Sequence, residues 1–340
     1  MRSSRLLAVT GLSVAALLLA ACGDSSSEDA SGSEGSGEFP VTVEHAFGET
    51  TIESEPERVA TVAWSNHEVP LALGIVPVGM SEAVWGDDDG DGVLPWVEDR
   101  LEELDAETPV LFDETEGIDF EAVADTQPDL ILAAYSGMSE EDYETLSKIA
   151  PVVAYPDTPW ATGWRETIEM NSKALGRADE GEKLVADLEQ QIADGVAERP
   201  ELEGKTALFS YLEPADLSEI GYYTTRDPRA QFFADLGLGT PSIVEEGAKA
   251  SEEFYLTQSA EEADAFEDTD IFITYGNEAL RQELRDDPLV STIPAIANDA
   301  IVMFEDNTPL AAAGNPSALS IPWGLDQYLD LLAEAAAKAQ

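Results

Sequence analysis

Short apolar runs alternate with amphipathic stretches from about residue 40 to the end of the chain. The run at residues 130–134 has no polar residue, which is typical of a strand that is buried on both faces of a sheet. Stretches such as 120–126 and 140–149 carry apolar residues at helical spacing. Further strands are expected at 58–62, 76–80 and 152–155. Apolar strands separated by helices predict a parallel sheet covered by helices on both faces.

A second series of the same kind follows, with strands expected at residues 206–211, 270–275 and 300–304. Two α/β lobes are therefore predicted, the first at residues 40–162 and the second at 199–340.

Residues 163–198 between the lobes are expected to form connecting helices. The stretch 179–196 places Leu184, Leu188 and Ile192 on one face. As a helix it would be about 27 Å long, enough to run between the lobes. A last amphipathic helix at about 317–338 is expected to return to a lobe.

The first residues differ in character from the rest of the chain. Arg2 and Arg5 precede an apolar run at 6–19, which is shorter than the about 20 residues of a membrane span. We expect a signal peptide at residues 1–21 and a flexible tether, rich in Gly, Ser, Asp and Glu, at 22–39. The Leu-Ala-Ala-Cys sequence that ends at Cys22 resembles the lipobox of bacterial lipoproteins. The resemblance implies lipidation of Cys22 and anchoring on the outer face of the cytoplasmic membrane; an ordinary signal peptide is the alternative.

The charge balance excludes one large class of partner. The chain has 17 Lys and Arg residues against 70 Asp and Glu residues, a formal net charge of −53. No basic face for a phosphate backbone can be built from so few cations, so nucleic acid is not expected as a partner. One Cys cannot form an internal disulfide, and two His cannot build a multi-histidine metal site.

An ordered series of segments resembles a known family. His-Ala-Phe-Gly at 45–48 and Pro-Glu-Arg-Val at 56–59 come first. The other segments of the series are 71–79, 120–123, 127–132 and 149–155. Together they resemble the substrate-binding lipoproteins of iron-siderophore ABC transporters, a group that includes binders of haem and vitamin B12.

The resemblance implies an α/β fold of two Rossmann-like lobes joined by a single long helix, with a ligand cleft between the lobes. It implies a protein that captures a ferric siderophore and delivers it to an ABC permease, with no required cofactor and no chemistry on the ligand. One glutamate on each lobe would dock with the permease, and the motif places these at Glu121 and Glu262. We expect the protein to act as a monomer.

Ligand recognition is expected from aromatic walls and a few donors, located beyond the carboxyl ends of strands. The aromatic candidates after strand ends are Trp64, Trp85, Tyr135, Tyr211, Tyr222, Tyr223 and Tyr275. Arg226 is the expected donor to oxygen-rich groups. Packing in the core is the alternative for each aromatic residue, and a surface ion pair is the alternative for Arg226.

Several alternatives remain for the ligand and the function. The strong negative charge disfavours polyanionic ferric catecholates and favours ferric hydroxamates, which are neutral or cationic. The same scaffold could bind haem or cobalamin. Common catalytic motifs are absent from the sequence, so the alternative from another class is a secreted hydrolase that relies on carboxylates alone.

An acidic segment fits the pattern of a calcium loop. Residues 87–98 satisfy D-x-D-x-D-G-x5-E, with the turn at Gly92. The expected oxygen ligands are Asp87, Asp89, Asp91, the backbone carbonyl of Val93, and Glu98. The alternative is a solvated acidic loop in a very acidic chain.

Overall fold

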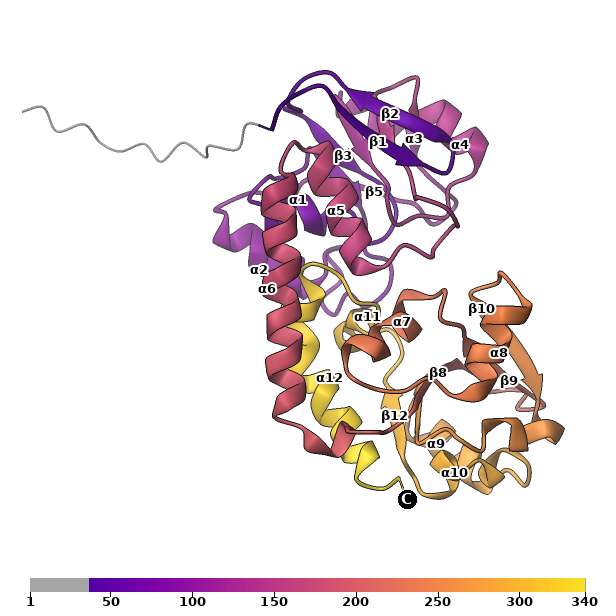
Figure 1. Cartoon of the computed structure of the whole chain (residues 1–340). Coiled ribbons are helices and arrows are strands. Elements are labelled where there is room, and N and C mark those ends of the chain that lie inside the picture. Colours follow the sequence, from indigo (N-terminus) through magenta and orange to yellow (C-terminus); the bar gives the residue numbers. More distant parts are fainter. Residues whose placement is uncertain (1–36, 340) are drawn as a thin grey trace, which may run out of the picture. The chain divides into compact units, whose positions relative to one another are not determined.

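Two five-stranded sheets organise residues 37–339, which are the residues that the computed structural model describes (Figure 1). The expected signal peptide, Cys22 and most of the expected tether lie outside the described residues. Within the described part of the chain, no helix is both long enough and apolar enough to cross a bilayer.

The first sheet has the strand order β5-β4-β3-β6-β7, and all neighbouring strands are parallel. Its strands are β3 (Val59–Thr61), β4 (Gly79–Ser81), β5 (Val110–Phe112), β6 (Leu130–Leu132) and β7 (Val152–Val153). Its helices are α1 (Glu68–Ala72), α2 (Pro95–Glu103), α3 (Phe120–Asp125), α4 (Glu140–Leu146) and α5 (Trp164–Ala174). An antiparallel hairpin, β1 (Val41–His45) and β2 (Gly48–Ile52), precedes this sheet. The central strands β3 and β6 are fully buried, as their apolar sequences predict.

The second sheet has the strand order β10-β9-β8-β11-β12. Its strands are β8 (Ala207–Tyr211), β9 (Glu219–Tyr223), β10 (Tyr255–Ser259), β11 (Ile271–Tyr275) and β12 (Ile301–Phe304). Its helices are α7 (Pro228–Asp235), α8 (Ser242–Ala250), α9 (Glu278–Asp286), α10 (Pro294–Ala297), α11 (Pro309–Ala313) and α12 (Ser320–Ala336). The second half of the chain also contains three short 3₁₀ helices: η1 (Pro200–Leu202), η2 (Ala260–Phe266) and η3 (Val290–Thr292).

The second sheet is mixed, which differs from the parallel sheet expected for a repeat of the first series. Strands β8, β11 and β12 are parallel, whereas β9 is antiparallel to both β8 and β10. The connection from Tyr211 to Glu219 explains the difference, since a parallel pair needs a crossover of about a dozen residues or more. Residues 219–223, where no strand is expected from the sequence, therefore pair as a strand.

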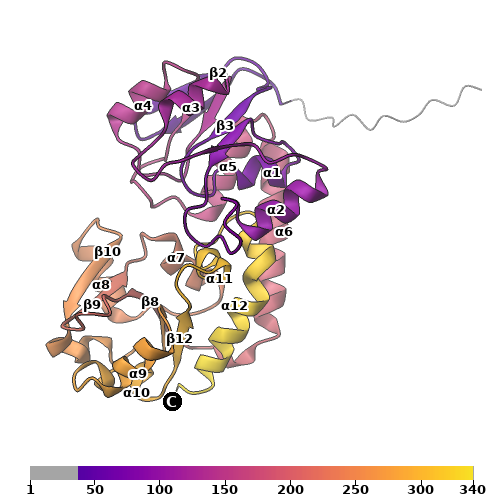
Figure 2. The same cartoon turned by 180° about the vertical axis from the view of Figure 1, so that it is seen from behind.

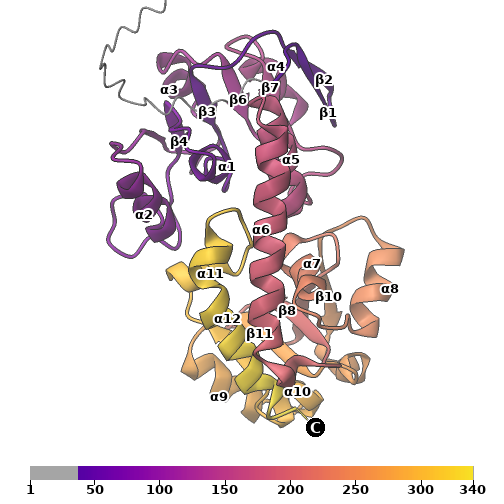
Figure 3. The same ribbon diagram turned by 60° about the vertical axis from the view of Figure 1, so that its left-hand side comes forward.

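One long helix, α6 (Ala178–Ala197), joins the two halves, as the sequence predicts. It packs against α5 near the first sheet and against α12 near the second (Figure 3). Two glycines permit this close packing. A Cβ at Gly181 would lie 2.0 Å from Ser172 Oγ in α5, and one at Gly195 would lie 2.8 Å from Leu329 Cδ1 in α12. Leu188 and Ile192 between them are buried in the core of the second half.

A buried carboxylate connects the two halves a second time. Glu68 in α1 is 1% exposed and accepts a hydrogen bond from Trp96 Nε1 of α2 at 2.9 Å. Its other oxygen accepts one from Leu319 N at 2.9 Å and one from the hydroxyl of Ser317, both on the segment that leads into α12. Burial raises the pKa of Glu68, and these hydrogen bonds act in the opposite direction.

Candidate ligand-binding site

A hollow of about 460 Å³ lies where residues of the two lobes meet. It is lined by Trp64, Trp85, Tyr211, Tyr223, Arg229, Tyr275, Asp306 and Asn315. The first two follow strands of the first sheet, and the others come from the second half of the chain. The structure thus brings together five of the aromatic residues that the sequence predicts for the site.

Trp64 is held by an ordered loop after β3. Ala63 and Ser65, on either side of it, have φ values of 61° and 60°. The Asn66 side chain donates to Val62 O at 2.9 Å and to Tyr135 O at 2.8 Å, which ties this loop to the one after β6. The indole of Trp64 is therefore presented on a fixed backbone.

The aromatic side chains of the hollow contact one another across the two lobes. The ring centroids of Trp64 and Trp85 are 6.3 Å apart, and those of Trp85 and Tyr275 are 5.5 Å apart in an edge-to-face arrangement. Tyr211, at the end of β8, is 47% exposed. These rings give the hollow broad apolar walls, which suit a large and rigid ligand.

Arg229 is the one cation that lines the hollow within the described residues. Its Nε and Nη2 donate to the two carboxylate oxygens of Asp227, at 2.8 and 2.7 Å. Its guanidinium carbon lies 3.8 Å from the centre of the Tyr223 ring, and its Nη1 is 3.4 Å from Tyr275 Oη. Asp227, only 1% exposed, also caps α7, so the arginine is fixed before any ligand arrives.

The charge of Arg229 is secure at every physiological pH. Burial acts to lower its pKa, but the hydrogen bonds and charge of Asp227 outweigh burial, so the pKa lies well above its usual value. A guanidinium has five N–H donors, and three of them have protein partners here. The remaining donors can bind anionic oxygens of a ligand.

Arg226 and Tyr222, two of the residues predicted for ligand binding, do not line the hollow. The Nε of Arg226 instead donates to Ser251 O at 3.3 Å. Tyr222 is 4% exposed and packs edge to face against Phe266, because successive residues of strand β9 point to opposite faces of the sheet. Arg229, three residues further along the chain, is the arginine at the hollow.

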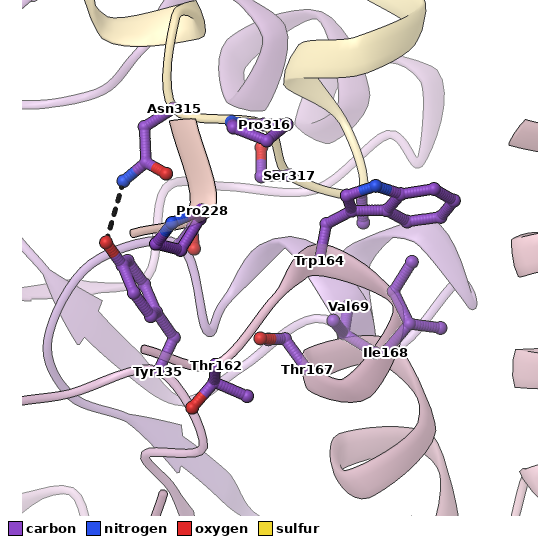
Figure 4. A pocket seen from close by; sticks show the side chains of 12 residues that line it. Val69, Tyr135, Thr162, Trp164, Thr167, Ile168, Pro228, Asn315, Pro316 and Ser317 are labelled. Carbon is purple, nitrogen blue, oxygen red and sulfur yellow. Dashed lines mark hydrogen bonds between the residues drawn. The ribbon is translucent and has the colours of Figure 1, made fainter. Parts of the chain in front are cut away.

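Tyr135 does not line the hollow itself and instead lines a small cavity between the lobes (Figure 4). Its hydroxyl accepts a hydrogen bond from Asn315 Nδ2 at 3.0 Å, and Asn315 also lines the hollow above. Burial raises the pKa of Tyr135, so its hydroxyl stays protonated. The hydrogen bond of Tyr135 therefore positions Asn315 and connects the two lobes.

Three residues of the hollow were missed by the sequence analysis: Arg229, Asp306 and Asn315. Two of them carried a usable signal. Asp306 follows the end of β12, where the rule on carboxyl ends of strands applies as it does to Tyr275. Asp227-Pro228 is a helix start, which places Arg229 in the first turn of α7. No local signal marks Asn315.

The two glutamates expected to dock with a permease are both exposed. Glu121 lies in the first turn of α3, and Glu262 lies in η2 just after β10. In Figures 1 and 2, α3 and β10 lie on the side of the molecule away from α6. The side chain of Glu262 accepts a hydrogen bond from Gln258 Nε2, whereas Glu121 has no ion pair within residues 37–339.

The acidic segment expected to bind calcium forms a tight loop before α2. One ligand oxygen from each of Asp87, Asp89 and Asp91 lies within 4.8 Å of the others. Gly92, with φ +86°, donates its N–H to Asp87 Oδ2 at 2.7 Å. These donors match a hard divalent cation that prefers oxygen ligands.

Glu98, the expected last ligand, lies in the first turn of α2 and is not among the residues whose ligand oxygens converge. Burial, followed by repulsion from Asp91 and Asp89, raises the pKa of Glu98 to about 7. For Asp87, burial acts to raise the pKa, but hydrogen bonds from the N–H groups of Gly90 and Gly92 outweigh it and lower the pKa. The loop is thus a concentration of negative charge without a cationic side chain.

A family model described as periplasmic binding protein matches residues 59–308. The fold and the interlobe hollow define a two-lobed solute-binding protein, and the chain belongs to the periplasmic binding protein family. Members of this family bind solutes and are not enzymes, so the carboxylate-dependent hydrolase has no support.

The comparisons identify named relatives. The chain is similar to the crystal structure of PiaA from Streptococcus pneumoniae TIGR4 in complex with ferrichrome, with 46% identity and a TM-score of 0.85 over 88% of this chain and 100% of that one. It is 31% identical over 182 residues to "Probable siderophore-binding lipoprotein YfiY" of Bacillus subtilis (strain 168), covering 53% of this chain and 52% of that protein. The chain thus spans about half the length of that curated relative.

A third relative is matched along most of its length. The chain is 26% identical over 312 residues to the Fe(3+)-citrate-binding protein YfmC of Bacillus subtilis (strain 168), covering 90% of this chain and 91% of that protein. The resemblance to siderophore-binding proteins of ABC transporters is therefore confirmed.

Proposed function

We propose that this protein captures a ferric siderophore of the hydroxamate type in the hollow between its lobes and delivers it to an ABC permease. The residues that line the hollow are the main support for this proposal. The hollow combines aromatic walls with one guanidinium, that of Arg229, whose N–H groups without a protein partner would suit a ligand that is rich in oxygen. The relative bound to ferrichrome, a ferric hydroxamate, supports the same ligand class.

The electrostatics of the hollow favour a hydroxamate over a ferric catecholate. The charge of Arg229 is already balanced by Asp227, and Asp306 adds a further negative charge. A polyanionic chelate would meet no excess of positive charge there, whereas a neutral ferric trishydroxamate offers oxygens to Arg229 and apolar surface to the aromatic rings.

A fluorescence titration of the purified protein tests this function. Trp64 and Trp85 line the hollow, so a bound ferric chelate should quench their emission. We expect saturable quenching by ferrichrome and none by the iron-free chelator or a ferric catecholate. Tight binding of haem or cobalamin in place of every iron chelate would keep the binding-protein fold and contradict the ligand class.

A matched pair of variants tests which arginine binds the ligand. Arg229→Lys keeps the charge beside Asp227 but loses the planar donors, so the Kd for ferrichrome should rise about tenfold. Arg226→Lys makes the same chemical change outside the hollow and should leave the Kd unchanged. The reverse result would return Arg226 to the site and remove Arg229.

We propose that Glu121 and Glu262 dock with the permease and that the protein acts as a monomer. Both carboxylates are exposed, one on each lobe, which suits contact with arginines of a membrane partner. Changing both to Ala should abolish transport in cells and leave the Kd for the siderophore unchanged. Changing Glu144 and Glu267, which are also exposed, provides a control of equal charge. Loss of siderophore binding in the first double variant would contradict the docking role.

We propose that Cys22 carries a lipid and anchors the protein outside the cytoplasm. The supporting observations are the sequence before Cys22 and the printed name of a relative, which calls that protein a lipoprotein. Labelled fatty acid should be incorporated by the wild-type protein and not by Cys22→Ala. Equal incorporation by both would contradict the proposal.

We propose that the loop at residues 87–98 binds calcium through Asp87, Asp89, Asp91, the carbonyl of Val93, and Glu98. The support is the full sequence pattern together with the convergence of the three aspartates. Isothermal titration with calcium should show one site of extracellular affinity, at about 10⁻⁴ to 10⁻³ M, that is lost in Asp87→Asn. Equal heats for the wild type and the variant would contradict a site in this loop.

A further inference from the structure

Asp306 is a carboxylate of the hollow that has no cationic partner within residues 37–339. It follows β12 in an exposed turn, and its Oδ1 accepts a hydrogen bond from Trp85 Nε1 at 3.2 Å. Asn307, the next residue, accepts from Gly86 N at 2.8 Å and so fixes this turn against the loop that carries Trp85. The carboxylate is therefore held beside the indole with its second oxygen available.

The two charged groups that line the hollow differ in their surroundings. Arg229 is neutralised by Asp227 and lies against Tyr223. Asp306 has no such counter-charge and lies beside Trp85, whose ring is 6.3 Å from that of Trp64. Indole faces attract cations more strongly than other aromatic side chains do, and a nearby carboxylate adds to this attraction.

We propose that Asp306, together with the indole rings of Trp64 and Trp85, forms a subsite for an alkylammonium group attached to the bound iron chelate. This inference rests on the proposed capture of a ferric hydroxamate and specifies its class. The protein would prefer a ferric trishydroxamate with a pendant cation over the same chelate without one. Arg229 would contact the iron-binding oxygens, while the Asp306 subsite would hold the charged arm.

A local site is needed because the overall charge cannot supply this preference. The chain carries a formal charge of −53, which attracts every cation at long range. Screening limits such attraction to about 10 Å at ordinary ionic strength. A preference for the cationic chelate that depends on the single carboxylate of Asp306 therefore distinguishes the subsite from the overall negative charge of the protein.

The test uses two ligands that differ only in the charge of the arm. Ferrioxamine B is a linear ferric trishydroxamate with a terminal ammonium, and its N-acetylated derivative is the same chelate without the charge. A cation held by an exposed carboxylate and an indole should favour the ammonium form by about fivefold in Kd. The preference should shrink as salt is added.

Two protein variants locate the effect. Asp306→Asn keeps an acceptor for Trp85 Nε1 but removes the charge, so the ratio of the two Kd values should fall to about one. Glu305→Gln removes one charge from the neighbouring exposed residue, which does not line the hollow, and should keep the ratio of the wild type.

Each outcome bears on a separate claim. Equal affinities of the wild-type protein for the two ligands would overturn the subsite, and so would a preference that survives in Asp306→Asn. In both cases the proposed function would stand, because a ferric hydroxamate still binds. If neither of the two ligands nor ferrichrome binds, the proposed function is wrong, and the proposed subsite is then wrong as well.

Discussion

The buried link at Glu68 allows a prediction whose size follows from the structure. Ser317→Ala removes the hydroxyl that donates to Glu68, together with its contacts to Ser320 N and Ser320 Oγ, and leaves the bonds from Trp96 Nε1 and Leu319 N in place. A hydrogen bond to a charged group contributes about 1.5–3 kcal/mol, and a carboxylate that is 1% exposed has little access to replacement water. We expect the free energy of unfolding to fall by about 2 kcal/mol.

Urea denaturation followed by circular dichroism measures this change as a lower midpoint with an unchanged m-value. Trp96→Phe removes a second donor from the same carboxylate and should cost a similar amount. Its matched control is Trp323→Phe, because Trp323 lies beside Trp96 and is 37% exposed. A loss below about 0.5 kcal/mol in Ser317→Ala would refute the reasoning that this hydrogen bond stabilises the fold.

The cost of Ser317→Ala should also depend on pH. The hydroxyl donates to the ionised form of Glu68 and so acts to lower its pKa, while burial raises that pKa above the usual value. The penalty should be fully present above the raised pKa of Glu68 and should shrink as the carboxyl group is protonated in acid. A penalty that stays constant through the pH range in which Glu68 titrates would contradict this dependence on the ionised carboxylate.

Three further measurements test other parts of the fold. A Cβ at Gly79 would lie 2.2 Å from Phe112 Cζ, so Gly79→Ala should lower stability by about 1–3 kcal/mol, seen as a lower Tm; an unchanged Tm would contradict the packing. Burial lowers the pKa of His67 to about 4, so nuclear magnetic resonance should show its ring neutral at pH 5.5. Since the pKa of His67 is lower in the folded protein than in the unfolded chain, the contribution of the neutral ring to stability is fully present above about pH 6.5 and is lost as the pH falls toward 4. A ring that titrates near pH 6.5 would be inconsistent with burial. Tyr135→Phe removes the hydrogen bond to Asn315 and should cost about 1 kcal/mol in urea denaturation, and no cost would show that this contact is replaceable.

Most of the fold could be predicted because strand burial leaves a clear pattern in the sequence. The apolar residues of β6 and the mostly apolar residues of β11 fill both faces of a covered sheet, and the spacing of Leu188 and Ile192 identifies α6. Strand β9 was missed because it follows β8 after a short connection and pairs with it antiparallel, outside the expected series of strands separated by helices. Strand β10 was missed because it is the edge strand of the second sheet and none of its residues is fully buried, so no long apolar run marks it.

The candidate site was predictable where it depends on strand ends and not where it depends on turns. Trp64 follows a strand of the first sheet, and Tyr211 and Tyr275 end strands of the second sheet. All three line the hollow because the carboxyl ends of strands from both sheets border it. The choice between Arg226 and Arg229 depends on the direction in which the chain leaves β9. That direction is set by the cap of α7, a detail of a few dihedral angles that residue spacing alone does not reveal.

The two lobes are held together by contacts of two kinds. The close glycine contacts of helix α6 and the hydrogen bonds of Glu68 are buried. The hydrogen bonds of Asp306 to Trp85 and of Asn307 to Gly86 involve exposed side chains at the hollow or beside it. Separation of the lobes would break the exposed contacts before the buried ones, so we expect a small movement between the lobes and not a wide hinge motion.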